Sequence, residues 1–285
     1  MKVSGDGRNR EIYNRPDVAS HYADLDYLTP CEQFLFDLYI KPKTSVLDLG
    51  VGGGRTTPYL AQRASRYVGL DYAVEMIRLC RHKYPELEFV EAEASDLSAF
   101  AAGSFEAIVF AFNGMDYVIP DGKRQRCLEE CFRMLKPGGV LVFSSHNPHY
   151  IFAPPAWNRQ RVRDLAGKFA GPDSVGRFAL TLLTFVAWTF ASLRAGWKSI
   201  ARGIARIPRR AFWRGEGCLF DAAHGGLITH CWIPRLAIAE LEKRGFQFEK
   251  AVGNDYPQVR GEYSTDWYYY VFSKPNSVGS GEICA

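Results

Sequence analysis

One stretch decides the fold of this chain: it runs Val46-Leu47-Asp48-Leu49-Gly50-Val51-Gly52-Gly53-Gly54-Arg55-Thr56. Its first half is a short apolar run, which predicts a buried strand. The glycines that follow predict a tight turn before a helix. A turn this rich in glycine lets the backbone approach a ligand closely and allows positive φ values that strain other residues. We therefore expect a ligand-binding loop directly after this strand.

Strands and helices alternate on both sides of this loop. Short apolar runs predict strands over residues 45–50, 67–70, 88–91, 107–112, 140–144, 246–252 and 267–273. Apolar side chains at helical spacing predict helices over residues 17–23, 30–40, 56–66, 75–83, 124–135 and 234–244. Such alternation is typical of βαβ units. We therefore expect a doubly wound, Rossmann-like α/β domain with a seven-stranded sheet, the last pair of strands antiparallel.

The predicted elements divide the chain into five segments. Residues 1–44 form an N-terminal arm with helices, in which residues 1–16 are expected to be loose, and residues 45–147 form the core. A mostly helical insertion after the fifth strand covers residues 148–226. Residues 227–275 form the C-terminal part of the core, and residues 276–285 a disordered tail. A parallel sheet of this kind binds ligands at the carboxyl ends of its strands. We expect the insertion to cover that edge.

The glycine pattern separates two classes of nucleotide site. A dinucleotide site needs G-x-G-x-x-G, so that a pyrophosphate lies on the helix N-terminus. Here Arg55 occupies the position of the last glycine. A nicotinamide or flavin dinucleotide, and with it a dehydrogenase, is therefore disfavoured.

The same residues match a different pattern. Gly50, Gly52 and Gly54 form G-x-G-x-G two residues after Asp48, and Leu-Lys-Pro-Gly-Gly follows at residues 135–139. The chain resembles the class I S-adenosylmethionine (SAM)-dependent methyltransferases in these motifs and their order. The resemblance implies SAM as the cofactor, with Asp48 and the three glycines at its binding site.

The resemblance also assigns cofactor roles beyond the glycine loop. Asp71, at the end of the second predicted strand, corresponds to the carboxylate that accepts the ribose hydroxyl protons. Glu93 and Ala94 correspond to the Asp-Ala pair near the adenine amino group, with glutamate in place of the usual aspartate. Asn113 is expected near the methionine moiety or the sulfonium. In this family the N-terminal region commonly folds over the cofactor, where Tyr22, or alternatively Tyr13, closes the site.

Two polar segments are expected on the acceptor side of the site. Residues 112–117 follow the fourth strand and residues 145–149 follow the fifth, and both resemble stretches of a bacterial subgroup of small-molecule methyltransferases. His146 is our first candidate for a general base, because imidazole titrates near neutral pH; the alternative is a structural histidine at the strand end. Asp116 is the second catalytic candidate, with a competing role as N-cap of a short turn. Weaker candidates are His149, His224 and His230.

Composition indicates the cellular compartment and the classes of ligand that are disfavoured. The 285 residues contain seven scattered cysteines and no basic-apolar leader after Met1, which favours a reducing, cytoplasmic compartment. We expect no metal site, because no carboxylate cluster accompanies His146 and His149. The net charge of +4 by itself does not indicate nucleic-acid binding.

The excess positive charge of the chain is concentrated in the predicted insertion. Residues 178–193 contain no charged side chain, and as a helix they would span about 24 Å, too short for the roughly 30 Å hydrocarbon core. Arg194, Lys198, Arg202 and Arg206 recur every four residues opposite an apolar stripe. This predicts a basic amphipathic helix, so residues 178–214 are expected either to contact an anionic membrane peripherally or to form a lid over the core. A basic surface for a phosphorylated or nucleic-acid ligand is a third, disfavoured alternative.

Together these patterns predict a SAM-dependent methyltransferase. The expected reaction is O-methylation of a small-molecule or lipid-linked acceptor at or near the inner face of the membrane. The alternatives are methylation of a soluble natural product or metabolite, and a SAM-binding protein without catalysis. The acceptor, its reacting atom and the oligomeric state stay open at this level.

Overall fold

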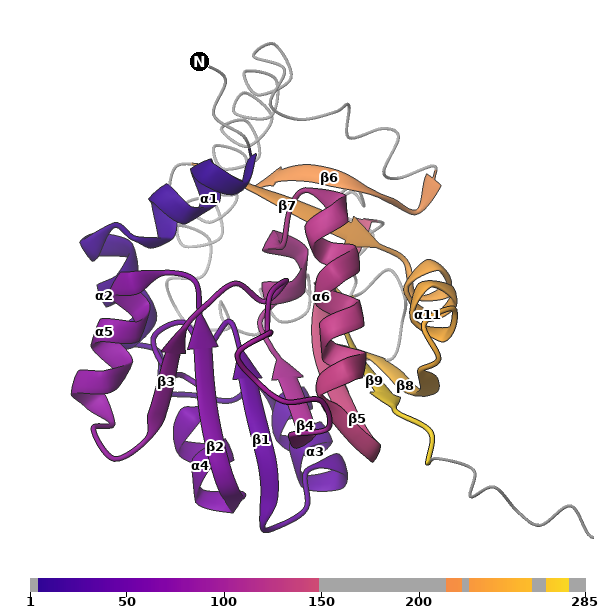
Figure 1. Ribbon diagram of the computed structural model, residues 1–285. Helices are drawn as coiled ribbons and strands as arrows, with labels where there is room; N and C mark the ends of the chain where they lie inside the picture. The colour runs from indigo at the N-terminus through magenta and orange to yellow at the C-terminus, as the bar shows by residue number, and fades with distance from the viewer. Residues whose placement is uncertain (1–4, 149–213, 222–225, 258–264, 277–285) are drawn as a thin grey trace, which may run out of the picture.

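The fold is built on one mixed sheet with strand order β3-β2-β1-β4-β5-β9-β8 (Figure 1). The computed structural model describes residues 5–148, 214–221, 226–257 and 265–276. The strands of the sheet are β1 (Thr44–Leu49), β2 (Ala64–Asp71), β3 (Glu88–Glu91), β4 (Phe105–Phe110), β5 (Leu135–His146), β8 (Gln247–Gly253) and β9 (Trp267–Ser273). The five strands β1 to β5 pair in parallel, in the order β3-β2-β1-β4-β5, whereas β9 is antiparallel to both β5 and β8. The predicted seven-stranded α/β sheet with an antiparallel last pair is confirmed.

Helices cover both faces of this sheet. The helices among the described residues are α1 (Gly5–Tyr13), α2 (Pro16–Ala23), α3 (Pro30–Tyr39), α4 (Thr57–Arg63), α5 (Val74–Lys83), the 3-10 turn η1 (Gly114–Tyr117), α6 (Asp121–Met134) and α11 (Pro234–Glu242). Successive side chains of a strand point to opposite faces. Leu47 and Ile108 therefore join the core shared with α6 and α11, whereas Val46 and Val109 join the core shared with α3, α4 and α5.

The strand order reverses between β1 and β4, and this reversal creates the ligand edge. β1 pairs with β2 on one side and with β4 on the other. Connections that leave the sheet toward opposite faces open a crevice at the carboxyl ends of the strands. The glycine-rich loop after β1 and η1 after β4 both lie at that edge (Figure 1).

Two elements at this edge were not predicted. The prediction of a loose arm over residues 1–16 is wrong for residues 5–13, which form α1. The side-chain amide of Asn9 donates to the Ile228 carbonyl at 2.8 Å and accepts from the Ile228 N–H at 2.9 Å. Arg8 Nε also donates to the Gly226 carbonyl at 2.7 Å. These long-range bonds hold a polar segment that has little apolar surface of its own.

The partner of α1 is a hairpin outside the main sheet. β6 (Glu216–Asp221) and β7 (Leu227–Trp232) form a separate antiparallel pair. Residues 227–232 therefore do not extend the main sheet, although we placed the resumption of the core at residue 227. Most of the predicted insertion, including His149, His224 and the basic stripe, lies outside the described residues, as does the predicted tail from residue 277.

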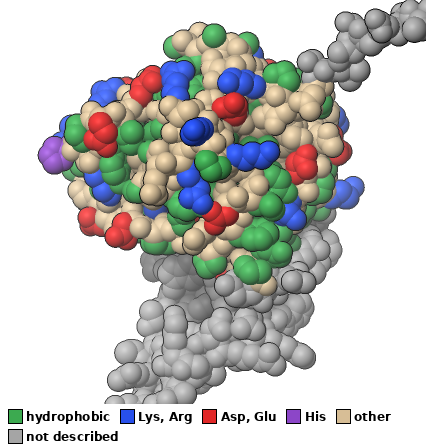
Figure 2. Space-filling view, turned by 90° about the horizontal axis from the view of Figure 1, so that it is seen from below, with side chains coloured by type: hydrophobic (Ala, Val, Ile, Leu, Met, Phe, Trp, Pro, Cys, Tyr) green, Lys and Arg blue, Asp and Glu red, His purple; other side chains and the backbone are tan. Residues whose placement is uncertain are grey.

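The opposite end of the molecule, where the parallel strands begin, has a mixed surface. Lys and Arg side chains are interspersed with Asp and Glu side chains on this face (Figure 2). Within the described part of the chain, no helix is both long enough and apolar enough to cross a membrane.

Candidate active site

The glycine-rich loop after β1 has the backbone conformation that its sequence predicts. Gly50, Gly52 and Gly54 all have positive φ values, of 61°, 55° and 83°. A Cβ atom on Gly52 would meet nothing closer than 4.0 Å, so the backbone there borders open space. The Gly52 N–H donates to Asp71 Oδ2 at 2.9 Å, and Asp71 Oδ1 accepts from the Ala73 N–H at 2.9 Å. Asp71 thus fixes the loop while its carboxylate borders the cavity above it.

Asp48 supports the loop from below. Its carboxylate is buried and accepts hydrogen bonds from Thr56 Oγ1 at 2.6 Å and from the Tyr67 hydroxyl at 2.9 Å. Burial raises the pKa of Asp48 to about 6, although both hydrogen bonds oppose the rise. Because the pKa of an unfolded aspartate is about 3.9, the protonated form favours the folded state.

This shift predicts a pH dependence of stability. The contribution of Asp48 is fully present below pH 4 and is lost as the pH rises through about 6. The free energy of unfolding of the wild type, relative to Asp48→Asn, should therefore fall by about 2 kcal/mol between pH 4 and pH 7. Urea titrations of both proteins across this range measure the difference. Parallel pH profiles of the two proteins would contradict the prediction.

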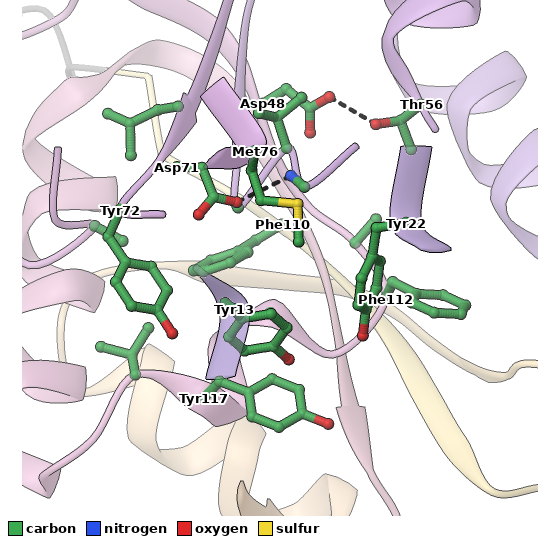
Figure 3. Close-up of a pocket in the computed structure, with 18 of the residues that line it drawn as sticks. Tyr13, Tyr22, Asp48, Thr56, Asp71, Tyr72, Met76, Phe110, Phe112 and Tyr117 are labelled. Carbon is green, nitrogen blue, oxygen red and sulfur yellow. Dashed lines mark hydrogen bonds between the residues drawn. The ribbon is translucent and has the colours of Figure 1, made fainter. Parts of the chain in front are cut away.

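A cavity lies above the loop (Figure 3). Of the residues predicted to bind the cofactor, those that line it are Asp48, Gly50, Gly52, Asp71, Glu93, Ala94 and Tyr22. Gly54 and Asn113 are not among the lining residues; a Cβ atom on Gly54 would instead meet the side chains of Tyr84 at 2.9 Å and Cys80 at 3.3 Å. Phe112 and Tyr117, from the segment 112–117 that we expected on the acceptor side, also line the cavity. Further lining residues that we did not predict include Arg55, Tyr72, Met76 and Lys123.

Glu93 occupies the cavity wall as the centre of two ion pairs. Its carboxylate pairs with Arg10 of α1 and, at 3.2 Å, with Lys123 Nζ of α6. The sequence contains no local signal for these pairs, since the three residues are far apart in the chain. They link the N-terminal arm to the rim of the cavity.

The arm also contributes aromatic rings. Tyr13 lies between Tyr22, Tyr72 and Tyr117, with ring centroids 5.8 to 6.2 Å apart and planes steeply inclined (Figure 3). Both tyrosines that we expected to close the site, Tyr13 and Tyr22, therefore line the cavity. Residues 13 and 22 come from the ends of α1 and α2, so the two arm helices together form its outer wall.

The structure also explains why arginine occupies position 55 of the glycine-rich loop. Its guanidinium forms a buried ion pair with Glu32 of α3, with N–O distances of 2.7 and 2.5 Å. The Tyr269 hydroxyl donates to Glu32 Oε1 at 2.6 Å, and the guanidinium lies 4.7 Å from the Phe112 ring centroid. Arg55 thereby connects the glycine loop to α3 and β9 at the position where a dinucleotide-binding loop would have glycine.

Beside the cavity, the structure brings His146 and Asp116 together. His146 Nδ1 lies 2.7 Å from Asp116 Oδ2, and the His146 N–H donates to the same oxygen at 2.7 Å. Ser145 Oγ donates to Asp116 Oδ1 at 2.6 Å. Asp116 is fully buried, and burial raises its pKa, while the bonds from His146 and Ser145 oppose the rise. The alternative role of Asp116 as an N-cap is wrong, because the N-cap of η1 is Asn113.

The Asp116 carboxylate fixes the orientation of the imidazole. With Asp116 accepting the Nδ1 proton, Nε2 of the neutral ring carries the lone pair and lies 3.4 Å from Asn113 Nδ2. The Tyr117 ring, which lines the cavity, packs edge-to-face against His146 at 6.1 Å between centroids. The Tyr117 ring therefore separates His146 from the cavity.

The remaining histidine candidate has different surroundings. His230 is buried on β7 and packs edge-to-face against Trp232, with centroids 5.1 Å apart. Burial, together with the charges of Arg124 and His146, holds its pKa well below the usual value. Among the described residues, no group of three or more His, Cys, Asp or Glu side chains is placed to hold a metal ion.

The fold and the cavity define a Rossmann-like domain with its ligand site at the switch point of the sheet. A family model described as a methyltransferase domain matches residues 46–139. A demethylmenaquinone methyltransferase from Beutenbergia cavernae is 33% identical over 198 residues, which cover 66% of this chain and 72% of that protein. An uncharacterized methyltransferase from Synechocystis sp. is 34% identical over 123 residues, or 42% of this chain and 57% of that protein.

A solved structure shares the fold. The 1,6-didemethyltoxoflavin-N1-methyltransferase from Burkholderia thailandensis, with bound 1,6-didemethyltoxoflavin and S-adenosylhomocysteine, has a TM-score of 0.55 at 14% identity, covering 97% of this chain and 93% of that one. This chain belongs to the class I SAM-dependent methyltransferases, a family whose cofactor is SAM. The chain spans about half the length of several curated relatives that it matches.

Proposed function

We propose that this protein transfers the methyl group of SAM to a hydroxyl oxygen of a small-molecule acceptor, with His146 as the general base. The observation that carries the proposal is the contact of 2.7 Å between His146 Nδ1 and Asp116 Oδ2 beside the cavity. A buried carboxylate that fixes the imidazole tautomer is the arrangement that a general base requires. An amine or carboxylate acceptor would have less need of such a base.

The cavity residues fit SAM. The Asp71 carboxylate borders the cavity next to the open backbone of Gly52, where it can accept hydrogen bonds from ribose hydroxyls. Tyr13 and Tyr22 provide aromatic walls that exclude water, and Glu93 and Ala94 line the same cavity, which supports their assignment to the adenine. For Glu93 to bind the adenine amino group, its carboxylate must be shared with or released from Arg10 and Lys123.

The proposed mechanism relies mainly on positioning. Bound SAM supplies an activated methyl group, whose carbon–sulfur bond breaks as the new oxygen–carbon bond forms and S-adenosylhomocysteine leaves. His146 Nε2 takes the hydroxyl proton, and Asp116 stabilises the resulting imidazolium through Nδ1. Alignment of the reacting atoms supplies the rest of the rate enhancement.

The reaction is tested with SAM labelled by carbon-13 in the methyl group. The purified chain is incubated with bacterial small-molecule and membrane extracts, and the products are analysed by NMR. A transferred methyl with the chemical shift of an O-methyl group supports the proposal. A methyl on nitrogen or carbon would contradict the role of His146 as a hydroxyl base, and SAM binding with no labelled product from any extract would favour a non-catalytic SAM-binding protein.

We also propose that the acceptor is met at an anionic membrane surface, a proposal that rests on the sequence of residues 178–214. Their cations recur at helical spacing opposite apolar side chains, which is the pattern of an in-plane membrane helix. A soluble metabolite as acceptor is the alternative, with the same residues acting as a lid.

Vesicle binding separates these two settings. The wild type should sediment with vesicles that contain phosphatidylserine but not with pure phosphatidylcholine vesicles, and less so at high salt. The double variant Arg202→Glu and Arg206→Glu should lose most of this binding. A matched control with the same charge change, Arg78→Glu and Lys243→Glu on exposed helix positions, should retain it. Equal sedimentation of the wild type and the Arg202/Arg206 double variant would contradict the membrane proposal and favour a soluble metabolite as the acceptor.

A further inference from the structure

We propose that Asn113 positions the methyl acceptor, and that the acceptor carries a second hydroxyl group adjacent to the one that is methylated. This inference rests on the proposed function, because it takes His146 Nε2 as the atom that receives the proton. It adds a specificity-determining residue and a chemical class of acceptor, the vicinal diols.

The first observation is an unpaired carbonyl. Asn113 is only 5% exposed, and its Oδ1 atom has no hydrogen-bond partner among the described residues. Buried polar side-chain atoms are normally paired, and leaving one unpaired is costly. A buried amide oxygen without a donor is therefore a candidate contact for a ligand that brings the donor.

The second observation fixes which end of the amide is unpaired. Asn113 Nδ2 lies 3.4 Å from His146 Nε2. Because Asp116 takes the Nδ1 proton, Nε2 is an acceptor, and the amide NH2 group rather than the oxygen must face it. At 3.4 Å this hydrogen bond is long and weak, so a hydroxyl that enters between the two side chains can replace it.

The third observation is the backbone that presents this side chain. Phe112 and Asn113 have φ values of 54° and 63°, in the left-handed region that is unfavourable for a residue such as phenylalanine. The Asn113 N–H donates to Ser144 Oγ at 2.6 Å, which holds the turn against β5. Strained residues that persist next to a reactive group commonly position that group or its ligand.

These contacts define what the acceptor must offer. One hydroxyl accepts a hydrogen bond from Asn113 Nδ2 and gives its proton to His146 Nε2, and a second hydroxyl donates a hydrogen bond to Asn113 Oδ1. Because Nδ2 and Oδ1 are bonded to the same amide carbon, two hydroxyls on neighbouring carbons of the acceptor match their spacing. Both a catechol ring and a sugar-like diol have this arrangement.

The test uses four fragments: catechol, phenol, cis-1,2-cyclohexanediol and cyclohexanol. Their dissociation constants for the full chain, saturated with S-adenosylhomocysteine, are measured by ligand-observed NMR. One neutral hydrogen bond to a buried oxygen predicts that a diol binds about five- to tenfold more tightly than its mono-hydroxyl counterpart. A preference within the catechol pair identifies an aromatic acceptor, and a preference within the cyclohexane pair identifies a sugar-like one.

Two variants isolate the amide oxygen. Asn113→Gly keeps the left-handed backbone, which glycine adopts without strain, and removes only the side chain; it should abolish the preference for the diol. Asn113→Asp retains an acceptor oxygen and should preserve the preference. Equal binding of diol and mono-hydroxyl fragments by the wild type, no detectable binding of any fragment, or an unchanged preference in Asn113→Gly would overturn the inference.

A failure of the inference about Asn113 can be distinguished from a failure of the proposed function. If the chain binds diols selectively but transfers no methyl group to oxygen, the proposed reaction fails and the binding role of Asn113 stands. If O-methylation is observed but the fragments show no diol preference, the reaction stands and the inference about Asn113 fails.

Discussion

Replacement of His146 by glutamine should lower kcat by about 10²- to 10⁴-fold, the usual contribution of general base catalysis, while SAM affinity stays unchanged. His146 does not line the cofactor cavity, so the substitution leaves that wall intact. The measurements are methyl-transfer kinetics and SAM titration by calorimetry. His82→Gln, an exposed position at the end of α5, is the matched control and should have wild-type kinetics.

Two further results separate a base from a structural histidine. Asp116→Asn should also lower kcat, because an amide no longer stabilises the imidazolium or enforces the tautomer. The loss in His146→Gln should shrink for acceptors whose hydroxyl is more acidic, since they need less help from a base. A defect that is the same for all acceptors, or that comes with weakened SAM binding, would assign His146 a structural role.

Arg55→Met should lower the free energy of unfolding by about 3–5 kcal/mol, because it leaves the fully buried Glu32 carboxylate without its cation. Among the described residues, the Glu32 carboxylate would then keep two hydrogen-bond donors. These are the Tyr269 hydroxyl at 2.6 Å and the Thr29 backbone N–H at 2.8 Å. Urea unfolding followed by circular dichroism measures the change.

The double variant Glu32→Gln and Arg55→Met serves as the control for the buried charge. It removes both charges and should recover most of the stability lost in the single variant, because the cost comes from an unpaired buried ion rather than from lost packing. A single variant that unfolds within about 1 kcal/mol of the wild type would show that the pair behaves like an exposed ion pair.

The sequence by itself determined the architecture of the core and the glycine loop. All seven predicted strands of the main sheet are present, because each is a short apolar run whose period and flanking glycines are local properties. Gly50 and Gly52 have positive φ values, which glycine adopts at little steric cost, and Asp71 follows from its place at the end of β2. His146 and Asp116 could be predicted only as two candidates at neighbouring strand ends.

Only the tertiary structure decided how these candidates combine. The contact of Asp116 with His146, the ion pairs of Glu93 and the burial of Arg55 against Glu32 join residues 23 to 83 positions apart, which no local pattern encodes. The helix α1 likewise depends on Asn9 reaching β7, since its polar sequence has little apolar surface to bury by itself. Local periodicity reports which face of an element is buried, whereas a site is assembled by contacts between elements, and those exist only once the chain has folded.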